Sequence, residues 1–472
     1  MTAINASPTK TFFVDMLVRD IELEDAILDL LDNCVDGIQR SIKDRSSDPE
    51  LPYRGFWAKI NFSDNEFTIK DNCGGIPLNV AQNYAFRMGR PIEINDPNLS
   101  IHSIGTYGIG MKRAIFKMGK SSEITSQTAN ESFRVTISSE WIDDSENWEL
   151  PLEQIESPYA ENGTMIRVTN LRDSISEDFG SPNSTFTNTL VARIAHSYNY
   201  IIKKGLTIFV NDKKVESTPF ELLWEGVDKI TSSEVVIAPY LYKSTYQEVS
   251  IELSVGFYRR DLATEEDVNR DNEGNRKVSD RAGWSIVCND RVVVYCDKTR
   301  LTGWGEAKVP NYHPQFISIA GVVHFRSADP RKLPITTTKR GLDLSSDVYL
   351  YTKNFMRESV KIFTNYTNKW KKDIPREKEI MRVTRFVDPN EIFNLIPENK
   401  WKNKNRDNGA YYQPSLPLPE SEKKKDGGKS IRFSRSPDEI KIVAEYLFED
   451  EERDANDVGD GCFDKVLKEA QS

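Results

Sequence analysis

The sequence predicts a protein of the mixed α+β class that is divided into several domains. Its 472 residues exceed the roughly 100 to 200 residues of a typical single domain. Segments with the period-two alternation of β-strands recur along the chain, between segments with helical periodicity. Hydrophobic residues make up 38 % of the chain and charged residues 29 %, which is typical of a globular protein with polar linkers.

Composition argues against several classes of protein. No apolar run approaches the ~18 residues of a membrane span, and the N-terminal MTAINASPTKTFF lacks the apolar centre of a signal peptide, so we expect a cytoplasmic protein without a membrane partner. The five cysteines contain no CxxC pair, which argues against a disulfide framework and a zinc site. The formal net charge of -10 argues against coating nucleic acid by charge alone, although a local basic groove would be compatible with it.

The first predicted element is a helix around AILDLLDNCVDG, residues 26–37. One stripe along it is apolar and suits burial: Leu23, Ile27, Leu30, Leu31 and Ile38. A second stripe is polar: Asp25, Asp29, Asp32, Asn33 and Asp36. Asp29 and Asn33 are four residues apart and project side by side, so a carboxylate and a neutral oxygen could together activate a water beside Mg²⁺. A solvated polar face would explain the same residues.

A β-hairpin is expected next, with the strands FWAKINF (56–62) and EFTIKD (66–71) on either side of the turn 63–65. The second strand ends in DNCGGIP, where Asp71 could point into a pocket that glycines open to a ligand. A buried carboxylate that accepts a hydrogen bond from an exocyclic amine would select adenine. An ordinary turn after a strand is the alternative interpretation.

A glycine-rich turn, GTYGIGMK at residues 105–112, is predicted to open a second helix. Its backbone amides and the positive end of the helix dipole would face phosphate oxygens. The order of glycines differs from both the dinucleotide-binding fingerprint and the P-loop. The nearby AIFKMGKS also fails as a P-loop, because Ala114 replaces its first glycine and no strand precedes it.

Further strands are predicted at SEITSQT, SFRVTISSE and GTMIRVTNL. A helical segment, TLVARIAHSYNYII, then leads into a second unit with two Asn-Asp turns between β-branched runs, IFVNDKKV and WSIVCNDRVVVY. The expected organisation is a first domain over 1–182, a second domain over 183–345, a long helix over 346–373, a flexible linker over 374–432 and an acidic helical tail over 433–472.

Taken in order, LDLLDN, DNCGGI, GTYGIGMK and the GT before a strand resemble the motifs of the GHKL ATPases, which share the Bergerat fold. This group includes gyrase B-type proteins, the large heat-shock chaperones, histidine kinases, MutL and MORC proteins. The resemblance covers about residues 10–175, and the ordered spacing makes it specific. It implies an ATP-binding α/β sandwich, followed by a transducer-like βαβ domain and a small helical C-terminal region. The cofactors that it implies are ATP and Mg²⁺.

The resemblance implies a role for each matching residue. Asp29 falls at the general base that activates the attacking water, and Asn33 at the Mg²⁺ ligand. Asp71 would accept the adenine amine, Gly75 would give the base room, and Thr164 would support the pocket. Further contacts with ATP are expected at Asp36, Ile76, Gly105, Gly108, Ile109, Gly110, Met111 and Lys112.

Two positions depart from the family pattern. The base is usually Glu, and Asp29 is one methylene shorter, so hydrolysis is expected to be slow. Cys73 replaces the first glycine of the usual DxGxG, which affects the local turn more than the adenine contact.

The second domain resembles the transducer domain of gyrase-type, MutL and MORC proteins, in which a loop lysine reaches the γ-phosphate. The segment LPITTTKRG supplies the candidate, Lys339, with Lys332 as the second choice. A solvated surface lysine is the alternative. A histidine kinase is excluded because the chain before the striped helix is too short for phospho-acceptor helices, and all four histidines come later.

MutL and MORC proteins use this chemistry to close a dimer, so the resemblance implies a slow ATPase that acts as an ATP-gated dimerisation switch or clamp. Its expected partners are ATP, a second copy of the chain, DNA, and an effector protein docked on the acidic tail, in a repair or antiviral defence role. The alternatives are a chaperone-like ATPase, disfavoured by the short region after the ATPase module, and a non-hydrolysing nucleotide sensor, allowed by Asp29.

Overall fold

The computed structural model describes residues 9–42, 48–87, 109–144, 147–181, 184–232, 235–260, 281–336, 339, 341–404, 409–419 and 434–471. The chain divides into two compact units, residues 1–418 and 419–472. None of the helices in these described ranges combines the length and the hydropathy that crossing a membrane requires.

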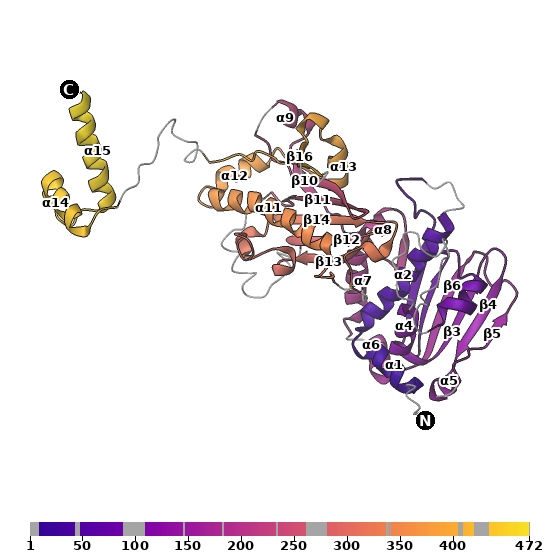
Figure 1. The fold of residues 1–472 in the computed structure, drawn as a ribbon. Helices are drawn as coiled ribbons and strands as arrows, with labels where there is room; N and C mark the ends of the chain where they lie inside the picture. Colours follow the sequence, from indigo (N-terminus) through magenta and orange to yellow (C-terminus); the bar gives the residue numbers. More distant parts are fainter. Residues whose placement is uncertain are drawn as a thin grey trace, which may run out of the picture. The chain divides into compact units, whose positions relative to one another are not determined.

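An eight-stranded sheet forms the N-terminal part of the first unit (Figure 1). Its strands are β1 (Trp57–Phe62), β2 (Glu66–Asp71), β3 (Gly119–Gln127), β4 (Ser132–Ile137), β5 (Leu152–Gln154), β6 (Gly163–Leu171), β7 (Thr207–Val210) and β8 (Lys213–Lys214). They are arranged in the order β5-β4-β3-β6-β2-β1-β7-β8, and all neighbouring pairs are antiparallel except β1 and β7.

The expected hairpin of β1 and β2 is confirmed. Phe62 pairs with Phe67 across the turn, and the Ser63 N–H donates a hydrogen bond to the Glu66 carbonyl at 2.9 Å. Ile60 and Phe62 are buried while the residues between and beside them are not, because successive side chains of a strand point to opposite faces.

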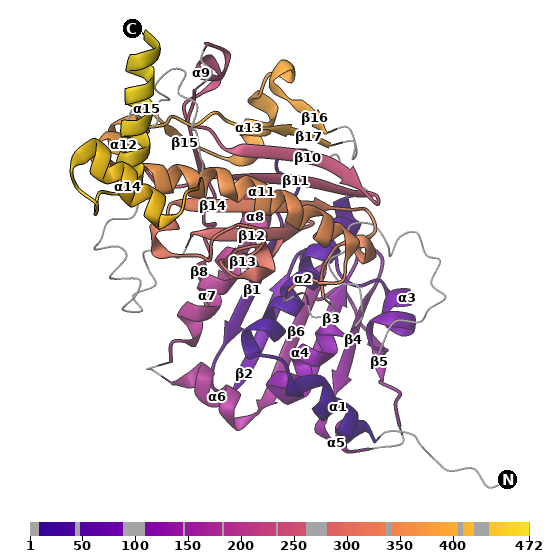
Figure 2. The same ribbon diagram turned by 60° about the vertical axis from the view of Figure 1, so that its left-hand side comes forward.

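Helices α2 (Leu23–Ile42) and α4 (Gly110–Met118) lie on one face of this sheet, and α1 (Lys10–Arg19) packs beside α4 (Figure 2). The shorter helices of this region are α3 (Leu78–Val80), η1 (Ala81–Ala85), α5 (Ser139–Asp143), α6 (Asp173–Gly180), α7 (Phe186–Ser197) and α8 (Asn199–Lys203). Ile27 and Leu31 of α2 are completely buried, which confirms the apolar stripe. Helices packed on a mixed sheet confirm the predicted fold class.

The N-terminal sheet extends beyond the boundary expected at residue 182. The run IFVNDKKV forms β7 and β8 of this sheet, with β7 parallel to β1, rather than the start of a second domain. The Asn-Asp turn itself is present, with positive φ angles of 44° at Asn211 and 62° at Asp212. Local turn chemistry therefore identified the hairpin, but the sheet that it joins depends on β1, more than 140 residues earlier.

A seven-stranded sheet forms the rest of the first unit. Its strands are β10 (Tyr240–Tyr246), β11 (Val249–Phe257), β12 (Gly283–Cys288), β13 (Arg291–Asp297), β14 (Ile319–Arg326), β16 (Lys402–Lys404) and β17 (Gly409–Tyr412). The order is β13-β12-β14-β11-β10-β17-β16, with β12 and β14 parallel and the other pairs antiparallel. Helix α11 (Asp347–Trp370) crosses this sheet and matches the long helix expected over 346–373 (Figure 1).

The smaller elements of this region are β9 (Leu222–Trp224), α9 (Val227–Ser232), η4 (Arg300–Thr302), η5 (Pro314–Phe316), η6 (Pro330–Lys332), α12 (Ile374–Met381), β15 (Arg385–Val387), α13 (Pro389–Leu395) and η7 (Glu398–Lys400). Much of the expected flexible linker, 374–432, is therefore folded. Strand β15 pairs with β9, and β17 pairs with β10. Buried Val387 and Ile392 pack with Trp224, so a few apolar side chains outweigh the polar local composition.

The second unit contains the two short helices expected in the acidic tail, α14 (Pro437–Phe448) and α15 (Ala455–Gln471). Helix α14 begins with a capping box, in which Ser436 and Glu439 satisfy each other's backbone amides. Few side chains of this pair are buried, among them Ala444 and Val458. Several large apolar side chains are exposed instead: Ile442, Tyr446, Phe448, Phe463, Val466 and Leu467.

Candidate functional site

The polar stripe of α2 is largely buried. Asp25, Asp29, Asp32 and Asp36 are all less than a tenth exposed, whereas Asn33 is exposed. Acidic side chains are rarely buried unless they are paired. The solvated-face interpretation is therefore wrong for these carboxylates, and their partners define a site.

Asp29 lies where α2 meets the first turn of α4. Its carboxylate forms an ion pair with Arg113 of α4, and a Cβ added to Gly110 would come within 3.3 Å of the Asp29 side chain. Burial raises the pKa of Asp29 above its ordinary value, although the positive charges of Lys339 and Arg113 act in the opposite direction. Burial thus favours proton uptake by Asp29, as a general base requires, and its pairing with Arg113 works against it.

Asp71 ends β2 with its carboxylate held by neighbouring groups. Its Oδ1 accepts hydrogen bonds from the backbone N–H of Cys73 at 2.8 Å and of Thr164 at 3.3 Å, and its Oδ2 accepts one from the Cys34 thiol at 3.4 Å. Burial raises the pKa of Asp71, and these hydrogen bonds oppose that rise. The carboxylate is fixed in place, as a selective hydrogen-bond acceptor must be.

Thr164 lies beside Asp71, and Gly75 belongs to the turn that follows β2. Gly75 has a positive φ of 74°, and a Cβ there would lie 2.1 Å from the carbonyl oxygen of Gln127. Ser126 connects the turn after β2 with β6, because its Oγ accepts a hydrogen bond from the Ile76 N–H at 2.7 Å and lies 3.3 Å from the Thr164 hydroxyl. The ends of β2, β3 and β6 therefore meet around Asp71.

Only part of the glycine-rich turn lies within the described residues. Gly105 and Gly108 lie outside them, whereas Ile109 is the N-cap of α4 and Gly110 its first residue. No side chain in the described part of the chain caps the start of α4, which packs against Asp29 at Gly110, and the helix dipole would stabilise an anion there.

Met111 and Lys112, at the start of α4, make contacts within the protein itself. The Met111 side chain is buried in the core of the N-terminal part. The Lys112 ammonium donates hydrogen bonds to the carbonyls of Ala85 at 2.8 Å and Arg87 at 2.6 Å. Burial lowers the pKa of Lys112 to about 8. Lys112 therefore ties α4 to the chain segment that ends at Arg87.

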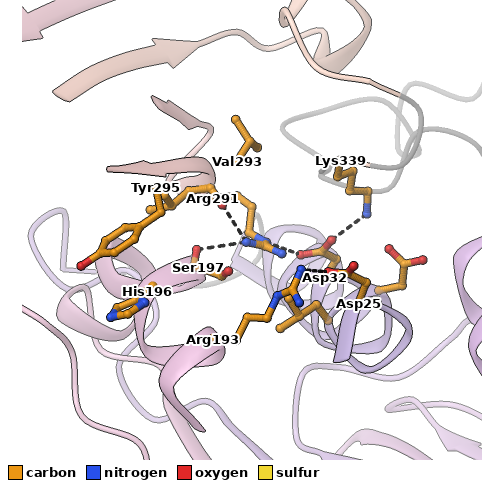
Figure 3. Close-up of a pocket in the computed structure, with 12 residues that line it drawn as sticks. Asp25, Asp32, Arg193, His196, Ser197, Arg291, Val293, Tyr295 and Lys339 are labelled. Atoms are coloured by element: carbon orange, nitrogen blue, oxygen red, sulfur yellow. Dashed lines mark hydrogen bonds and ion pairs between the residues drawn. The ribbon is translucent and has the colours of Figure 1, made fainter. Parts of the chain in front are cut away.

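Asp32 joins α2 to the second sheet (Figure 3). Arg291 Nε lies 3.0 Å from Asp32 Oδ1, Lys339 Nζ lies 2.9 Å from Oδ2, and the Tyr198 hydroxyl lies 2.6 Å from Oδ1. Burial acts to raise the pKa of Asp32, but the two cations and the hydroxyl outweigh it, so the pKa lies below its ordinary value. Asp32 thus stays charged and holds both cations.

The two candidate lysines of the second domain differ clearly in position. Lys339 reaches the polar stripe of α2, whereas Lys332 forms an ion pair with Glu248 at 2.6 Å. Lys339 is carried by the segment after β14, between the paired residues Ile335 and Leu342. Because Lys339 is held by Asp32, the solvated-lysine interpretation does not apply to it.

A pocket of about 230 Å³ lies between α2, α7 and β13 (Figure 3). It is lined by Asp25, Leu28, Asp29, Asp32, Arg193, His196, Ser197, Arg291, Val292, Val293, Tyr295 and Lys339. Its cations are paired with the carboxylates of α2, including Arg193 with Asp25 at 2.7 Å. Charge in the pocket is therefore balanced without a ligand.

The donor set on α2 fits Mg²⁺ better than a transition metal. Within the described ranges, no cluster of three or more His, Cys, Asp or Glu side chains could hold a metal ion. Mg²⁺ is usually bound through one or two protein oxygens, with water and phosphate completing its ligands. Asn33 presents such an oxygen on the exposed side of α2.

Several polar residues of the site were not anticipated from the sequence, among them Arg113, Ser126 and Arg291. Arg113 directly follows the glycine-lysine motif, so its position one turn into the helix could have suggested it. Ser126 and Arg291 contact the site only through sheet pairing and domain packing, for which the sequence carries no local signal.

Residues 21–171 match the family model described as histidine kinase-, DNA gyrase B- and HSP90-like ATPase. The match covers about a third of the chain, from the start of α2 to the end of β6, and includes Asp29, Asn33, Asp71 and Thr164. A search of curated proteins found no match.

Proposed function

We propose that this protein, whose residues 21–171 form an ATPase domain of the GHKL type, binds ATP between α2, the turn after β2 and the start of α4, and hydrolyses it slowly. The observation that carries the proposal is the packing of Gly110, at the start of α4, against Asp29, where an added Cβ would lie 3.3 Å from the Asp29 side chain. A helix start that favours phosphate and a carboxylate that can accept a proton are thereby brought together.

The adenine end is assigned to Asp71. Its fixed carboxylate would accept the exocyclic amine, with Gly75 and Ile76 against the base and Thr164 supporting the acceptor. Cys73 takes a glycine position of the family pattern, yet its N–H still donates to Asp71, which supports an intact adenine contact.

The phosphate end is assigned to Gly105, Gly108, Ile109 and Gly110 at the start of α4. Asp36 is assigned a contact nearer the adenine end of α2. When bound, Mg²⁺ supplies a positive charge that neutralises the phosphates, and Asn33 would hold it. Asp29 orients the attacking water and accepts its proton. The shorter reach of Asp, compared with Glu, accounts for slow turnover.

The second domain is proposed to act as a transducer. Lys339 holds Asp32, one helical turn from Asp29, so a γ-phosphate arriving at α4 would compete with Asp32 for the same ammonium. If Lys339 moves from Asp32 to the γ-phosphate, the contacts between the domains differ between the ATP-bound and ADP-bound protein. The two domain arrangements then bind ATP with different affinities, as a switch requires.

We assign the whole protein the role of an ATP-gated dimerisation switch or clamp, acting with DNA or an effector protein in repair or antiviral defence. The exposed apolar side chains of α14 and α15 support a docking role for the tail. A chaperone-like ATPase is the second candidate. The ion-paired state of Asp29 supports the third, a nucleotide sensor that does not hydrolyse ATP.

Asp29→Asn tests the ATPase and the switch together. The variant should bind ATP, lose phosphate release almost completely and accumulate as a dimer in ATP, because the amide cannot accept the water's proton. Phosphate release and sedimentation equilibrium measure these effects, with wild type in a non-hydrolysable ATP analogue as the reference dimer. A wild-type monomer under saturating analogue would contradict the switch, and unchanged turnover in the variant would contradict Asp29 as the base.

A further inference from the structure

We propose that Arg113 is a further catalytic residue, which contacts the terminal phosphate of ATP and, before ATP arrives, holds Asp29 in an ion pair that keeps it inactive as a base. This inference rests on the proposed function and deepens it, because it names a second residue, besides Lys339, by which the site distinguishes ATP from ADP.

The ion pair joins the two helices of the site. Arg113 lies on α4 three residues after Gly110, and one of its terminal nitrogens contacts Asp29 Oδ2. The side chains are only 16 % and 7 % exposed, respectively. Buried pairs are costly to form unless their geometry and hydrogen bonds are good, so this contact is unlike the exposed pairs of the surface.

Asp29 cannot work as a base while Arg113 holds it. The guanidinium occupies an oxygen lone pair and stabilises the charged carboxylate, which lowers its tendency to take up a proton. For the attacking water to use this carboxylate, Arg113 has to turn to another anion.

Arg113 has one donor available for such an anion. Its Nε is buried and has no hydrogen-bond partner among the described residues. Nε and the adjacent terminal nitrogen form one edge of the guanidinium, which binds two phosphate oxygens at once. An edge with one donor on Asp29 and the other unpaired is incompletely satisfied, and a phosphate would satisfy it.

Only the terminal phosphate is expected to draw Arg113 away. Arg113 is one turn into α4, beyond the helix start that would hold the inner phosphates, and on the Asp29 side. ADP would leave the ion pair closed, whereas ATP would open it and free the base next to the phosphorus that is attacked.

Hydrolysis of ATP in this site accounts for every bond and proton. The water oxygen bonds to the γ-phosphorus as the bond to the ADP oxygen breaks, and ADP leaves with that electron pair. The water's proton goes to Asp29, which returns it to solvent after phosphate leaves. Arg113 stabilises the charge on the transferred phosphoryl oxygens and is itself unchanged.

Arg113→Met and Arg113→Lys test the inference, with Arg167→Met as the matched control. Arg167 of β6 also pairs with an acidic residue, Glu66 at 2.6 Å, but on the exposed surface. For each variant, calorimetry gives the dissociation constants of ADP and of a non-hydrolysable ATP analogue, and steady-state assays give kcat and KM.

Both Arg113 variants should bind ADP as wild type does, lose about tenfold in affinity for the analogue, and lose on the order of 10²–10³ in kcat. Lysine preserves the charge and the fold but not the two-donor edge, so it should not restore kcat. Arg167→Met should leave all four quantities near wild type.

A structural role for Arg113 predicts a different pattern. The affinities for ADP and the analogue would then fall together, kcat would stay near wild type, and lysine would restore the lost affinity. That result would overturn the inference. The proposed function would still stand if the wild type hydrolysed ATP and Asp29→Asn did not. Failure of wild type to bind ATP would overturn both.

Discussion

At the scale of single residues, Asp29 and Asp32 show how two carboxylates one helical turn apart acquire different properties. The pKa of Asp29 is raised, mainly by burial, whereas the pKa of Asp32 is lowered because Lys339, Arg291 and the Tyr198 hydroxyl outweigh burial. Opposite shifts in neighbouring groups separate a proton acceptor from a permanently charged anchor. We assign the first role to Asp29 and the second to Asp32.

Lys339→Met should reduce the preference for ATP over ADP by about tenfold, because a charge-assisted hydrogen bond to the terminal phosphate contributes roughly 1.5–3 kcal/mol. Arg291 would still pair with Asp32 in the variant, so the contact between α2 and the second sheet should persist. The dissociation constants of ADP and of a non-hydrolysable ATP analogue measure the effect.

Lys332→Met is the matched control for this experiment, because Lys332 pairs with Glu248 away from α2. It should leave the ratio of the two dissociation constants unchanged. An equal change in both lysine variants would show that Lys339 has no specific role.

At the scale of secondary-structure elements, the sequence predicts well what local periodicity determines. The stripes of α2, the hairpin of β1 and β2, helix α11 and the two tail helices all follow from spacing and turn residues. The fold of residues 374–412 does not follow from local spacing. Strands β15 and β17 form because β9 and β10, at least 140 residues away, supply their hydrogen-bonding partners. Pairing at such separations leaves no local signal.

Strand β14 carries a buried histidine that makes stability depend on pH. Burial and the positive charge of Arg326 lower the pKa of His324 from 6.5 to about 3, with Asp290 opposing and Lys204 reinforcing the shift. Neither ring nitrogen has a hydrogen-bond partner within the described part of the chain. The native protein therefore keeps His324 neutral below the pH at which the unfolded chain protonates it.

The sign follows from proton uptake by the unfolded state. As the pH falls from 6.5 toward 3, the unfolded chain binds a proton that the native chain does not, so stability is lost at about 1.4 kcal/mol per pH unit. Between pH 6.5 and about pH 5 the free energy of unfolding should fall by about 2 kcal/mol on this account.

Urea unfolding of wild type and His324→Phe at these two pH values measures the contribution. The variant should show a smaller difference between the two pH values, because phenylalanine cannot titrate. An identical difference in both proteins would show that His324 does not control this pH dependence.

At the scale of the whole molecule, the site depends on contacts that cross most of the chain. Asp32 meets Arg291 and Lys339 across 259 and 307 positions. Sequence motifs identified Asp29, Asp71 and Lys339 as candidates, because the chemistry of nucleotide binding restricts residue types and spacing. They could not indicate that Asp29 is ion-paired or that Arg291 anchors the second sheet, since both depend on how separate elements pack.

The central claim is that one adenine nucleotide binds with its base on Asp71 and its phosphates at the start of α4. Calorimetric titration of wild type and Asp71→Asn with a non-hydrolysable ATP analogue in Mg²⁺ tests it most directly. We expect one nucleotide per wild-type chain and an affinity about 10- to 100-fold lower in the variant, from the loss of a charged hydrogen-bond acceptor. No binding to wild type, or equal affinity in both proteins, would contradict it.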